Sequence, residues 1–568
     1  MTQVSFILFN LIFFLIGRSL NIFFHTSQIN ENIDEKKIFG INIYVFYPLI
    51  ALIFVSNLVF LLNFLFPIEP LIPYIFLFGG VLIIYNISNK PKINVFKFKF
   101  LTFFVFPLLL SISSHGIWLG WDTGLYHLQN QAWIRESNLV LGLSNLNVWL
   151  GWSSIYEYLS SLFWLNGNYV VIHFVKLVVY NFFFCFLLHN IFENENKYLK
   201  FSSLGILLFS LLDNIGYLGG GNGFPPILTV GKFDEAFGIL FFVNSALILM
   251  RIMDKNFVKS ELIFIFYFSL YSFQLKQNGA YIIFPLLLYF YMFIKKSNAG
   301  FFKSLNLIKL PIVIGSLWIL KNVLITSCLL YPVTFTCISN LDWYGINTNY
   351  ATEGWLIRPA IDPRLDESIS QQFASWLSQS KNKQYSYNFL ISLVSIYIVN
   401  KIVLLKVSSE RNNKAGSNLI LFFIVLIIFW FYSNGANPRY AFGIWLFGIT
   451  LLYKNYENYE IRPIFTNYLR IIVITTSIVS VALVPRIYSY EAFIENQINF
   501  SEITLPWENK NPSFAGLSNP EYKESKYGFG VYSESALCWE VTECHHIDKS
   551  INYNSETFFK KFTTQSTP

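Results

Sequence analysis

Residues 41–66 read INIYVFYPLIALIFVSNLVFLLNFLF, and none of these side chains is charged. A helix needs about 20 apolar residues to cross the hydrocarbon core of a membrane, so this run can form one span. Thirteen further apolar runs resemble it, although several are shorter: 4–24, 71–88, 100–114, 169–190, 199–218, 236–252, 261–275, 279–294, 310–331, 385–405, 418–433, 439–453 and 469–488. The pattern predicts an all-α fold, a polytopic bundle of about 12–14 transmembrane helices.

The composition of the whole chain agrees with this interpretation. Of 568 residues, 54% are hydrophobic and only 13% are charged, whereas soluble proteins carry roughly 25% charged residues. So large an apolar fraction excludes a soluble enzyme, a disordered chain and a collagen-like chain. The net charge of +7 comes from short basic clusters between the apolar runs. Because there is no basic stripe or recognition motif, no nucleic-acid partner is expected.

The segments between the runs alternate in character. One set is longer and rich in Trp, Gly, Asn and Pro, and we expect it on the non-cytoplasmic side of the membrane. The other set is short and basic, and the positive-inside rule places it in the cytoplasm; its residues are Lys90, Lys92, Lys97, Lys99, Lys197, Lys200, Arg251, Lys255, Lys259, Lys295, Lys296, Lys303, Lys309, Lys406, Arg411, Lys414, Lys454 and Arg462. The first run has no basic leader and no cleavage site after it, so we expect a retained helix.

Two regions follow from this topology. Residues 1–489 are predicted to form the transmembrane domain, and residues 490–568 a small, polar, non-cytoplasmic C-terminal tail. Large outer loops are expected at 115–168 and 331–384. Within the second loop, residues 363–378 have the apolar spacing of an amphipathic helix lying on the membrane surface as part of a lid; the apolar positions are Leu365, Ile369, Phe373 and Trp376.

Four cysteines fall on or near the expected outer face, whereas Cys185 lies inside an apolar run, where it is expected to pack as a small apolar residue. An even number of outer cysteines fits disulfides in an oxidising compartment. The simplest pairings are Cys328 with Cys337 and Cys538 with Cys544, although four cysteines allow three connectivities. A zinc site of Cys538, Cys544, His545 and His546 is the alternative, but the CxxC spacing of structural zinc sites is missing.

The first outer loop carries the most informative carboxylate, in the stretch WLGWDTGLYHLQNQAW at residues 118–133. Asp122 has two readings, a helix N-cap or a functional carboxylate at the mouth of a membrane cavity. The spacing of Leu125, Leu128 and Ala132 predicts an amphipathic helix after it, lying along the membrane. Tryptophans that we expect at the membrane interface flank this helix: Trp118, Trp121, Trp133 and Trp149.

The stretch LTVGKFDEAFG, residues 228–238, supplies two more carboxylates where a span begins. Negative charge complements the N-terminus of a helix, which is the ordinary role for Asp234 or Glu235. The other of the two could face a cavity shared with Asp122. The glycines at 219–221 are not followed by the Gly-Lys-Ser/Thr of a phosphate loop, so nucleotide binding is not expected.

Cations on the outer side are few. Lys276 lies in the turn QLKQNG and Arg439 in NGANPRYAFG, whereas Lys321 is flanked by apolar residues in WILKNVLITS. Snorkelling to the interface is the ordinary role for a single lysine near the end of a span. Binding of a phosphate group is the alternative, and the planar guanidinium of Arg439 also suits a carboxylate. Lys232, next to Asp234, joins this candidate set.

These motifs resemble those of the GT-C glycosyltransferases, multi-spanning enzymes that take sugars from polyprenyl-phosphate carriers on the non-cytoplasmic side. Asp122 in GWDTGLYH matches the essential acid of their first outer loop, and Asp234 or Glu235 a second acidic position. WILKNVLITSCLLYP resembles a Trp…Arg-Asn segment of arabinosyl- and mannosyltransferase relatives, with Lys321 where Arg is usual. More closely, DTGLYHLQ, NPRYAFG and the CW…C of the tail resemble a bacterial family of GT-C-like membrane proteins. The resemblance covers most of the chain in order, but each motif is short.

The resemblance implies a reaction and a set of roles. Asp122 would be the base that accepts the proton of the acceptor hydroxyl, His127 would orient it or the acceptor, and Asp234 or Glu235 would be the supporting acid. The donor phosphate would be bound by Lys276, Lys321, Arg439 and Lys232. The expected partners are a polyprenyl-phosphate sugar donor, a lipid or cell-envelope glycan acceptor, and membrane lipids. Transfer in a single displacement would invert the anomeric centre, on the periplasmic face of a bacterial inner membrane.

One departure from the family pattern concerns the cofactor. Thr123 follows Asp122, where better-known members carry an Asp-Glu pair. A divalent cation is therefore the one cofactor that the resemblance leaves open. Two alternatives to a GT-C enzyme fit the same composition: a lipid-linked glycan transporter or flippase, and a protein like the O-antigen ligases and polymerases. A transporter usually has ionisable groups at mid-membrane and two related halves, whereas this chain keeps its polar residues on one face.

Overall fold

The structure is a computed structural model. It describes residues 2–24, 37–88, 98, 100–164, 169–215, 229–297, 300–345, 369–400, 405–407, 415–433, 441–453, 459–462, 468–498, 513–514, 522–525, 530–533, 538, 541–545, 551–554 and 559–564.

The described residues are mostly helical, and each of the fourteen apolar runs contains a helix, as predicted. The helices are α1 Thr2–Phe24, α2 Tyr47–Asn63, α3 Ile72–Ser88, α4 Phe106–Ser111, α5 Leu128–Glu136, α6 Ile155–Ser161, α7 Val170–Glu193, α8 Lys197–Ile215, α9 Asp234–Asp254, α10 Lys259–Leu275, α11 Ile283–Ser297, α12 Phe301–Leu307, α13 Lys309–Thr326, α15 Ile369–Ser378, α16 Ser380–Ile398, α17 Ala415–Ser433, α18 Phe442–Thr450, α20 Leu469–Leu483 and α21 Ile487–Ile498.

Six helical segments in the described part of the chain are long and apolar enough to cross a membrane, judged by length and composition: Thr2–Leu20, Ile43–Asn63, Val170–Glu193, Asp234–Asp254, Gln277–Lys296 and Lys309–Thr326. Five apolar helices of 10–17 residues are shorter. The described spans are thus fewer than the 12–14 that the sequence predicts, because several apolar runs form helices too short to qualify by themselves.

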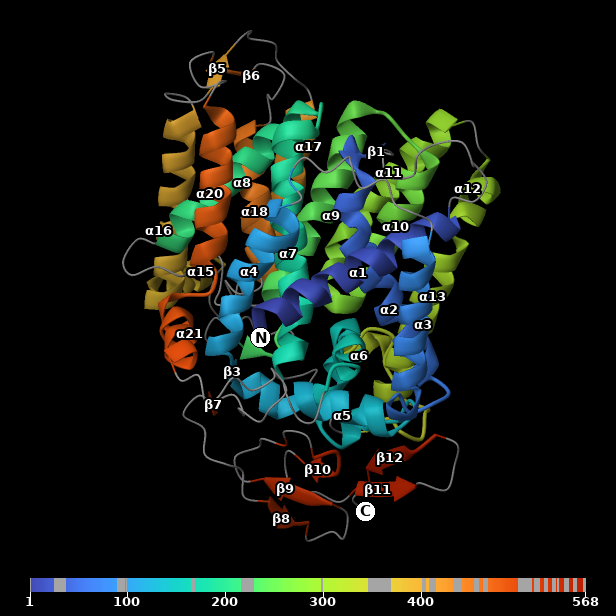
Figure 1. Cartoon of the computed structure of the whole chain (residues 1–568). Helices are drawn as coiled ribbons and strands as arrows, with labels where there is room; N and C mark the ends of the chain where they lie inside the picture. The colour runs from blue at the N-terminus through green and yellow to red at the C-terminus, as the bar shows by residue number, and fades with distance from the viewer. Residues whose placement is uncertain are drawn as a thin grey trace.

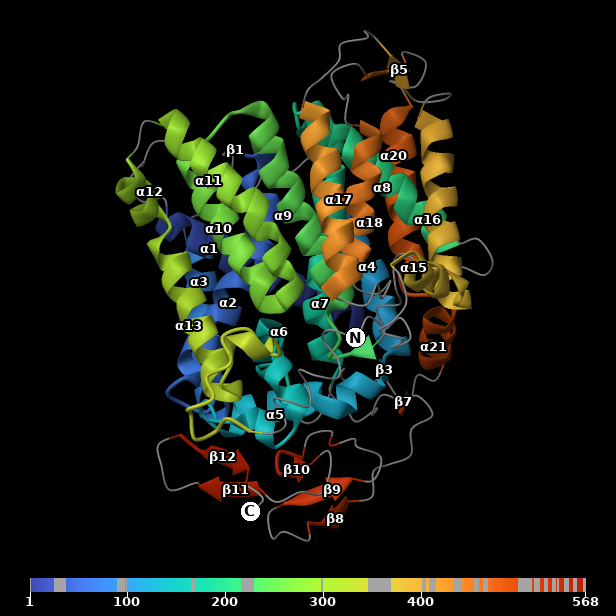
Figure 2. The same ribbon diagram turned by 180° about the vertical axis from the view of Figure 1, so that it is seen from behind.

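The long helices stand side by side, with α7 and α9 at the centre of the bundle (Figures 1 and 2). In both of these helices, 94% of the most apolar 18-residue stretch is buried inside the protein. Helix α18 packs closely on α9: a Cβ placed on Gly443 would lie 2.6 Å from the carbonyl oxygen of Gly238. Glycine at this crossing lets the two backbones approach, as in other tightly packed membrane helices.

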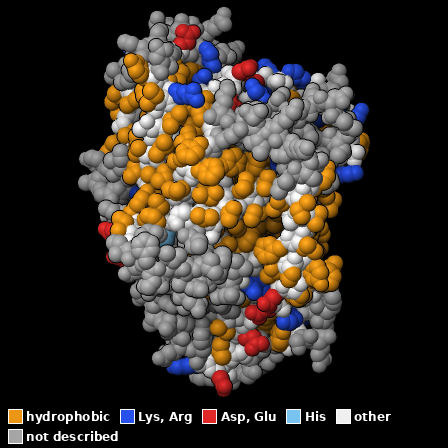
Figure 3. Space-filling view, viewed as in Figure 1, with side chains coloured by type: hydrophobic (Ala, Val, Ile, Leu, Met, Phe, Trp, Pro, Cys, Tyr) orange, Lys and Arg blue, Asp and Glu red, His pale blue; other side chains and the backbone are white. Residues whose placement is uncertain are grey.

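One end of the bundle, which we call the basic end, carries Arg251, Lys295, Lys296 and Lys309, where α9 and α11 end and α13 begins. Figure 3 shows hydrophobic side chains across the middle of this face and charged side chains of both signs toward either end. At that end Arg251 forms a buried ion pair with Glu261, and Lys296 donates to the backbone carbonyl of Lys255. The opposite end carries α5, which lies across the bundle, and the strands of the tail beneath it.

Short strands, which the sequence did not predict, tie distant loops together. Strands β3 (Trp118–Leu119), β4 (Thr229–Val230) and β7 (Ser513–Phe514) form a parallel sheet in the order β4-β3-β7. The tail contains β8 Tyr522–Glu524, β9 Val531–Ser533, β10 Cys544–His545, β11 Ile551–Asn554 and β12 Lys561–Thr564. At the basic end lie the pairs β1 Lys37–Ile38 with β2 Ile41–Asn42, and β5 Leu405–Val407 with β6 Tyr459–Ile461. One sheet therefore joins the tail to the outer loop 115–168, which contains β3, and to the segment before α9, which contains β4.

Candidate functional site

The β3–β4 pairing brings Asp122 and Lys232 together. Because the two strands are parallel, the chain leaves both at the same end of the sheet. There, Nζ of Lys232 lies 3.0 Å from Oδ2 of Asp122, and about a fifth of each side chain is exposed. Asp122 makes no capping hydrogen bond to the helix that follows, so the N-cap reading is wrong. The outer loop 115–168 and the segment before α9 are thus linked by one half-buried ion pair.

The turn after Asp122 is a π-helix, η7, which spans Thr123–His127. The sequence predicted an ordinary helical segment here. In a π-turn the backbone bond joins residues five apart, and such turns are frequent at functional sites. Gly231 has a φ of +85°, and a Cβ added to it would lie 3.1 Å from the Cβ of His127. Glycine therefore lets the loop after β4 rest against this turn.

His127 is held by a buried carboxylate that the sequence reading missed. Its Nδ1 lies 2.7 Å from Oε1 of Glu157, a residue with no exposed side-chain surface. The other oxygen of Glu157 accepts hydrogen bonds from the backbone N–H of Ser154, at 2.9 Å, and from the side chain of Asn130. With the proton on Nδ1, the ring of His127 donates to Glu157 and is fixed in orientation.

The position of Glu157 has a local explanation. Ser154 and Glu157 form a capping box at the start of α6, in which each caps the other's backbone. The pattern Ser-x-x-Glu is visible in the sequence and marks a helix start. The carboxylate therefore serves two purposes, because it closes the first turn of α6 and orients His127.

Lys321 lies inside the protein with none of its surface exposed. Its Nζ donates to Oγ of Ser153 over 2.6 Å and sits 3.7 Å from the centre of the Trp318 ring. No acidic group lies within ion-pair distance of this ammonium among the described residues. The snorkelling role is therefore wrong for Lys321, since its head group does not reach solvent. A buried cation held only by a hydroxyl and a ring is suited to an incoming anion.

Asp234 and Lys276 form a second ion pair at this end of the bundle. The residue before Lys276, Leu275, accepts a hydrogen bond from Oγ of Ser154 over 2.8 Å, so this pair adjoins the start of α6. Glu235 is nearly buried. The structure thus brings together Asp122, His127, Asp234, Glu235, Lys232, Lys276 and Lys321 at one end of the bundle.

A further buried cation, Lys176, belongs to this end. It lies fully buried in α7, and the charges of Glu235, Asp234 and Lys232 act on it. The sequence held a signal for it, because Lys176 is the only charged residue in the run 169–190. An ionisable residue within a membrane helix is a candidate functional residue by its cost alone.

Tyr156 is a fully buried phenol near Glu157 and Glu235. Its ring stacks on Phe233 with 4.3 Å between centroids, and its hydroxyl donates to the backbone carbonyl of Ile172. Burial, aided by the nearby carboxylates of Glu157 and Glu235, raises the pKa of Tyr156 well above its ordinary value. The phenol therefore stays neutral and acts as a wall, not as a base.

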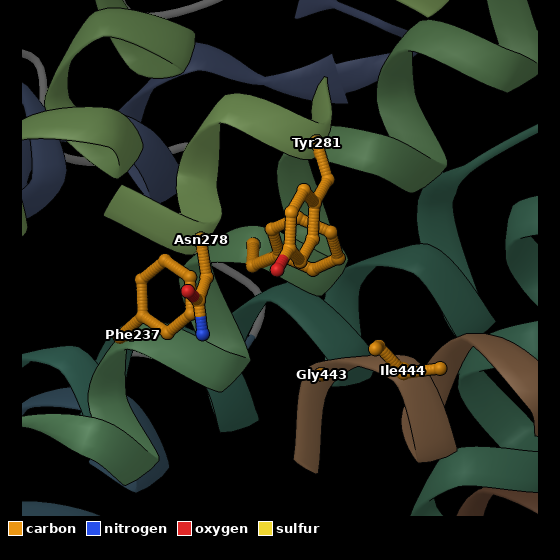
Figure 4. Close-up of a pocket in the computed structure, with 6 residues that line it drawn as sticks. Phe237, Asn278, Tyr281, Gly443 and Ile444 are labelled. Carbon is orange, nitrogen blue, oxygen red and sulfur yellow. The ribbon is translucent and has the colours of Figure 1, made fainter. Parts of the chain in front are cut away.

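A small aromatic hollow lies between α9, the 3-10 helix η10 (Gln277–Ile282) and α18 (Figure 4). Its lining residues are Phe237, Phe241, Asn278, Tyr281, Gly443 and Ile444. Phe237 lies one turn beyond Asp234 on α9, and η10 begins directly after Lys276. The hollow therefore extends from the charged pair along the apolar helices.

A second aromatic group stands beside His127. The Tyr126 ring lies 4.1 Å from that of His127 and stacks with Trp149, and Trp149 packs edge-on against Trp152 at 5.0 Å. All three rings are partly exposed. Flat aromatic faces beside a polar group are a common lining for small-molecule sites.

Helix α5 is not the surface-lying helix that the sequence predicted. Leu125, Leu128 and Ala132 are buried as expected, but so is the neighbouring face, which includes Gln129 and Trp133. The reason is that the tail covers this second face: Phe562 packs edge-on against Trp133. Of the tryptophans expected at the interface, Trp133 is therefore in a core, whereas Trp118 and Trp121 are exposed.

The remaining candidates are placed as follows. Cys328 is joined to Cys337 and Cys538 to Cys544, the simplest of the three connectivities. Because Cys538 and Cys544 are bonded to each other, they are not zinc ligands. Arg439 and the first part of the predicted helix 363–378 lie outside the described residues; the rest of that helix is α15.

The fold and the site define a class: a helical bundle with helices of membrane-spanning length and a cluster of buried carboxylates and lysines at one end. Residues 1–446 match the family model described as "Domain of unknown function (DUF8201)", and the chain belongs to this family. No curated protein and no solved structure matches the chain.

Proposed function

We propose that the protein is a membrane glycosyltransferase of the GT-C type. It transfers a sugar from a polyprenyl-phosphate-linked donor to a lipid or cell-envelope glycan acceptor, with inversion, on the periplasmic face of a bacterial inner membrane. The observation that carries the proposal is the pairing of Asp122 with Lys232 beside the His127–Glu157 pair. A carboxylate and an oriented imidazole meet there at the same end of the bundle as three further lysines.

The proton-transfer step belongs to the first outer loop. A glycosyl phosphate already has a good leaving group, so the protein needs a base for the acceptor hydroxyl and no acid for the phosphate. Asp122 accepts that proton while the hydroxyl oxygen attacks the anomeric carbon and the bond to the phosphate oxygen breaks. His127, fixed through Nδ1 by Glu157, presents its other nitrogen to the acceptor.

The departing phosphate requires cations where negative charge develops. Lys276 and Lys321 flank the start of α6, one bonded to Asp234 and the other to Ser153. If a phosphate oxygen takes the place of the Ser153 hydroxyl as the hydrogen-bond acceptor of Lys321, this lysine gains an anionic partner. Lys232, which is bonded to Asp122, can contact the phosphate after the acceptor has displaced it from the carboxylate.

The carrier lipid suits the hollow beside Lys276. An amphiphile with a phosphate head and an isoprenoid tail needs a cation next to an apolar surface, and the rings of Phe237, Phe241 and Tyr281 supply that surface. The sugar suits the second aromatic group, since Tyr126 and Trp149 lie against His127.

No step in this proposal passes through a metal ion. A divalent cation is the cofactor that the GT-C resemblance leaves open, but no group of three or more His, Cys, Asp or Glu side chains lies together as ligands in the described part of the chain. These residues do not fit a metal site of their own.

The proposal is tested by reconstituting the full chain in vesicles with a panel of polyprenyl-phosphate sugars and glycan acceptors. We expect a transfer product whose anomeric configuration, measured by NMR, is opposite to that of the donor. Movement of the lipid-linked sugar across the bilayer without any product would instead favour a flippase, and retention of configuration would contradict the single displacement.

A further inference from the structure

The tail is docked on the π-turn that follows Asp122. The backbone N–H of Cys538 donates to the carbonyl of Gly124, inside that turn, over 3.0 Å. Cys538 and Cys544 are joined by a disulfide, which closes a covalent ring whose described residues, 538 and 541–544, lie against the turn and α5. We call this loop the tail clasp.

Gln129, one residue into α5, is the main contact of the tail clasp with the protein. Its side-chain amide is fully buried, and Nε2 faces the carbonyl oxygens of Val541, Thr542 and Cys544 at 3.2, 3.3 and 2.8 Å. Buried carbonyl groups need donors, because an unsatisfied one costs the desolvation of the group. The side-chain amide of Gln129 thus supplies the hydrogen-bond donor for these three carbonyl groups of the tail clasp.

The other end of the Gln129 amide fixes the turn itself. Its Oε1 accepts from Nδ2 of Asn147 over 3.0 Å, and the same Nδ2 lies 3.0 Å from the carbonyl oxygen of Leu125. Leu125 is the middle residue of η7. The chain of contacts therefore runs from the tail clasp through Gln129 and Asn147 to the turn that carries His127.

Two other anchors hold the tail at this end. Leu141 forms a parallel bridge with Lys561: the N–H of Leu141 donates to the carbonyl of Lys560, and the N–H of Phe562 donates to the carbonyl of Leu141. The ring of Phe562 is completely buried. Strand β7 also pairs with β3, directly before Asp122. The residues of the tail lie beyond the 1–446 that match the family model.

We infer that Gln129 is a positioning residue and that the disulfide-closed tail clasp sets the geometry of the Asp122–His127 turn. The catalytic consequence of this inference rests on the proposed function, whereas the structural consequence does not. A displacement of about 1 Å in a reacting group can lower a rate by about a hundredfold. The donor-phosphate lysines Lys276 and Lys321 lie on other elements, and Lys232 lies on the loop after β4 and not in the turn, so loss of the tail clasp should leave donor binding nearly unchanged.

The test compares Gln129→Leu with Gln131→Leu in the full chain. Both residues are buried glutamines on α5, but Gln131 bonds to Trp164 and not to the tail. Hydrogen exchange at 122–132 reports the turn, and steady-state transfer separates kcat from the donor KM. We expect faster exchange at 122–132 and a fall in kcat of about tenfold to a hundredfold with unchanged donor KM in Gln129→Leu alone.

A second pair of variants covers failure of Gln129→Leu to fold. Cys538→Ser with Cys544→Ser opens the tail clasp, whereas Cys328→Ser with Cys337→Ser opens a disulfide that packs against Val148 and Trp152. Faster exchange at 122–132 only in the first pair supports the inference. Equal exchange at 122–132 in both pairs and in wild type overturns it. If exchange changes as expected and wild type transfers no sugar from any donor, the proposed function fails while the docking of the tail stands.

Discussion

Nζ of Lys232 lies 3.0 Å from Oδ2 of Asp122, although the two residues are 110 positions apart in the chain. The pair exists because β3 and β4 are parallel neighbours and end together. Two loops that the sequence presents as separate thereby place a carboxylate, an imidazole and an ammonium at one point.

Gly231 is expected to be indispensable for this arrangement. Alanine at its φ of +85° is strained, and the new Cβ would press on His127 and Thr123. Gly231→Ala should lower stability by about 1 kcal/mol or more and reduce transfer activity. Gly300→Ala, where a Cβ meets nothing within 4 Å, is the matched control. Equal melting temperatures and rates for the two variants would show that the close approach at Gly231 is unimportant.

Glu157→Gln should impair both folding and catalysis. The new amide either turns its N–H₂ group toward the donors of Asn130 and Ser154, which costs roughly 1–3 kcal/mol, or donates to Nδ1 of His127 and forces the ring into its other tautomer. Thermal unfolding measures the first effect, and transfer rates measure the loss of His127 orientation. The control is Glu69→Gln, an exposed partner of Arg135. Wild-type stability in Glu157→Gln would mean that the buried carboxylate is not satisfied by these three donors.

Lys321→Met separates stability from function. Replacing a buried charge by an apolar side chain of similar length is often neutral or stabilising, so the melting temperature should stay the same or rise. Affinity for a polyprenyl phosphate should nevertheless fall, by about tenfold if one charge-assisted contact of roughly 1.4 kcal/mol is lost. Binding of a fluorescent polyprenyl phosphate to the purified protein measures this. Unchanged affinity would remove Lys321 from the phosphate site.

Phe562→Ala should release the tail. The side chain is completely buried against α5 and its neighbours, and truncation of such a ring costs about 3–5 kcal/mol. Limited proteolysis should cut the C-terminal residues of this variant faster than those of wild type. Phe335→Ala, at a ring that is 91% exposed, should leave the digestion pattern unchanged. Identical proteolysis of Phe562→Ala and wild type would contradict a docked tail.

Much of the helical framework follows from sequence alone. The fourteen apolar runs all contain helices, because continuous apolar sequence has few other ways to satisfy its backbone in a membrane. The number of complete spans was harder to predict, since a run such as 100–114 is divided between a π-helix, α4 and a 3-10 turn. Such local changes of helix type have no clear signal in the hydropathy.

The site was predicted only in part, for a physical reason. Asp122, Asp234, Lys276 and Lys321 could be selected one by one because each charge is unusual near an apolar run. The pairing of Asp122 with Lys232, however, depends on a parallel sheet of two-residue strands, which has no readable period. Glu157 was missed because it falls within the predicted outer loop 115–168, where a carboxylate is ordinary, and the burial of Gln129 depends on a tail more than 400 residues away.

Sugar transfer by Asp122→Asn tests the central claim most directly. The variant keeps the size of the side chain and removes the base, and Asp254→Asn, an exposed acid at the opposite end of α9, is the control. With a polyprenyl-phosphate sugar that wild type uses, we predict a fall in kcat of at least about a hundredfold for Asp122→Asn, with the donor still bound and the control fully active. Full transfer activity in Asp122→Asn would contradict the account.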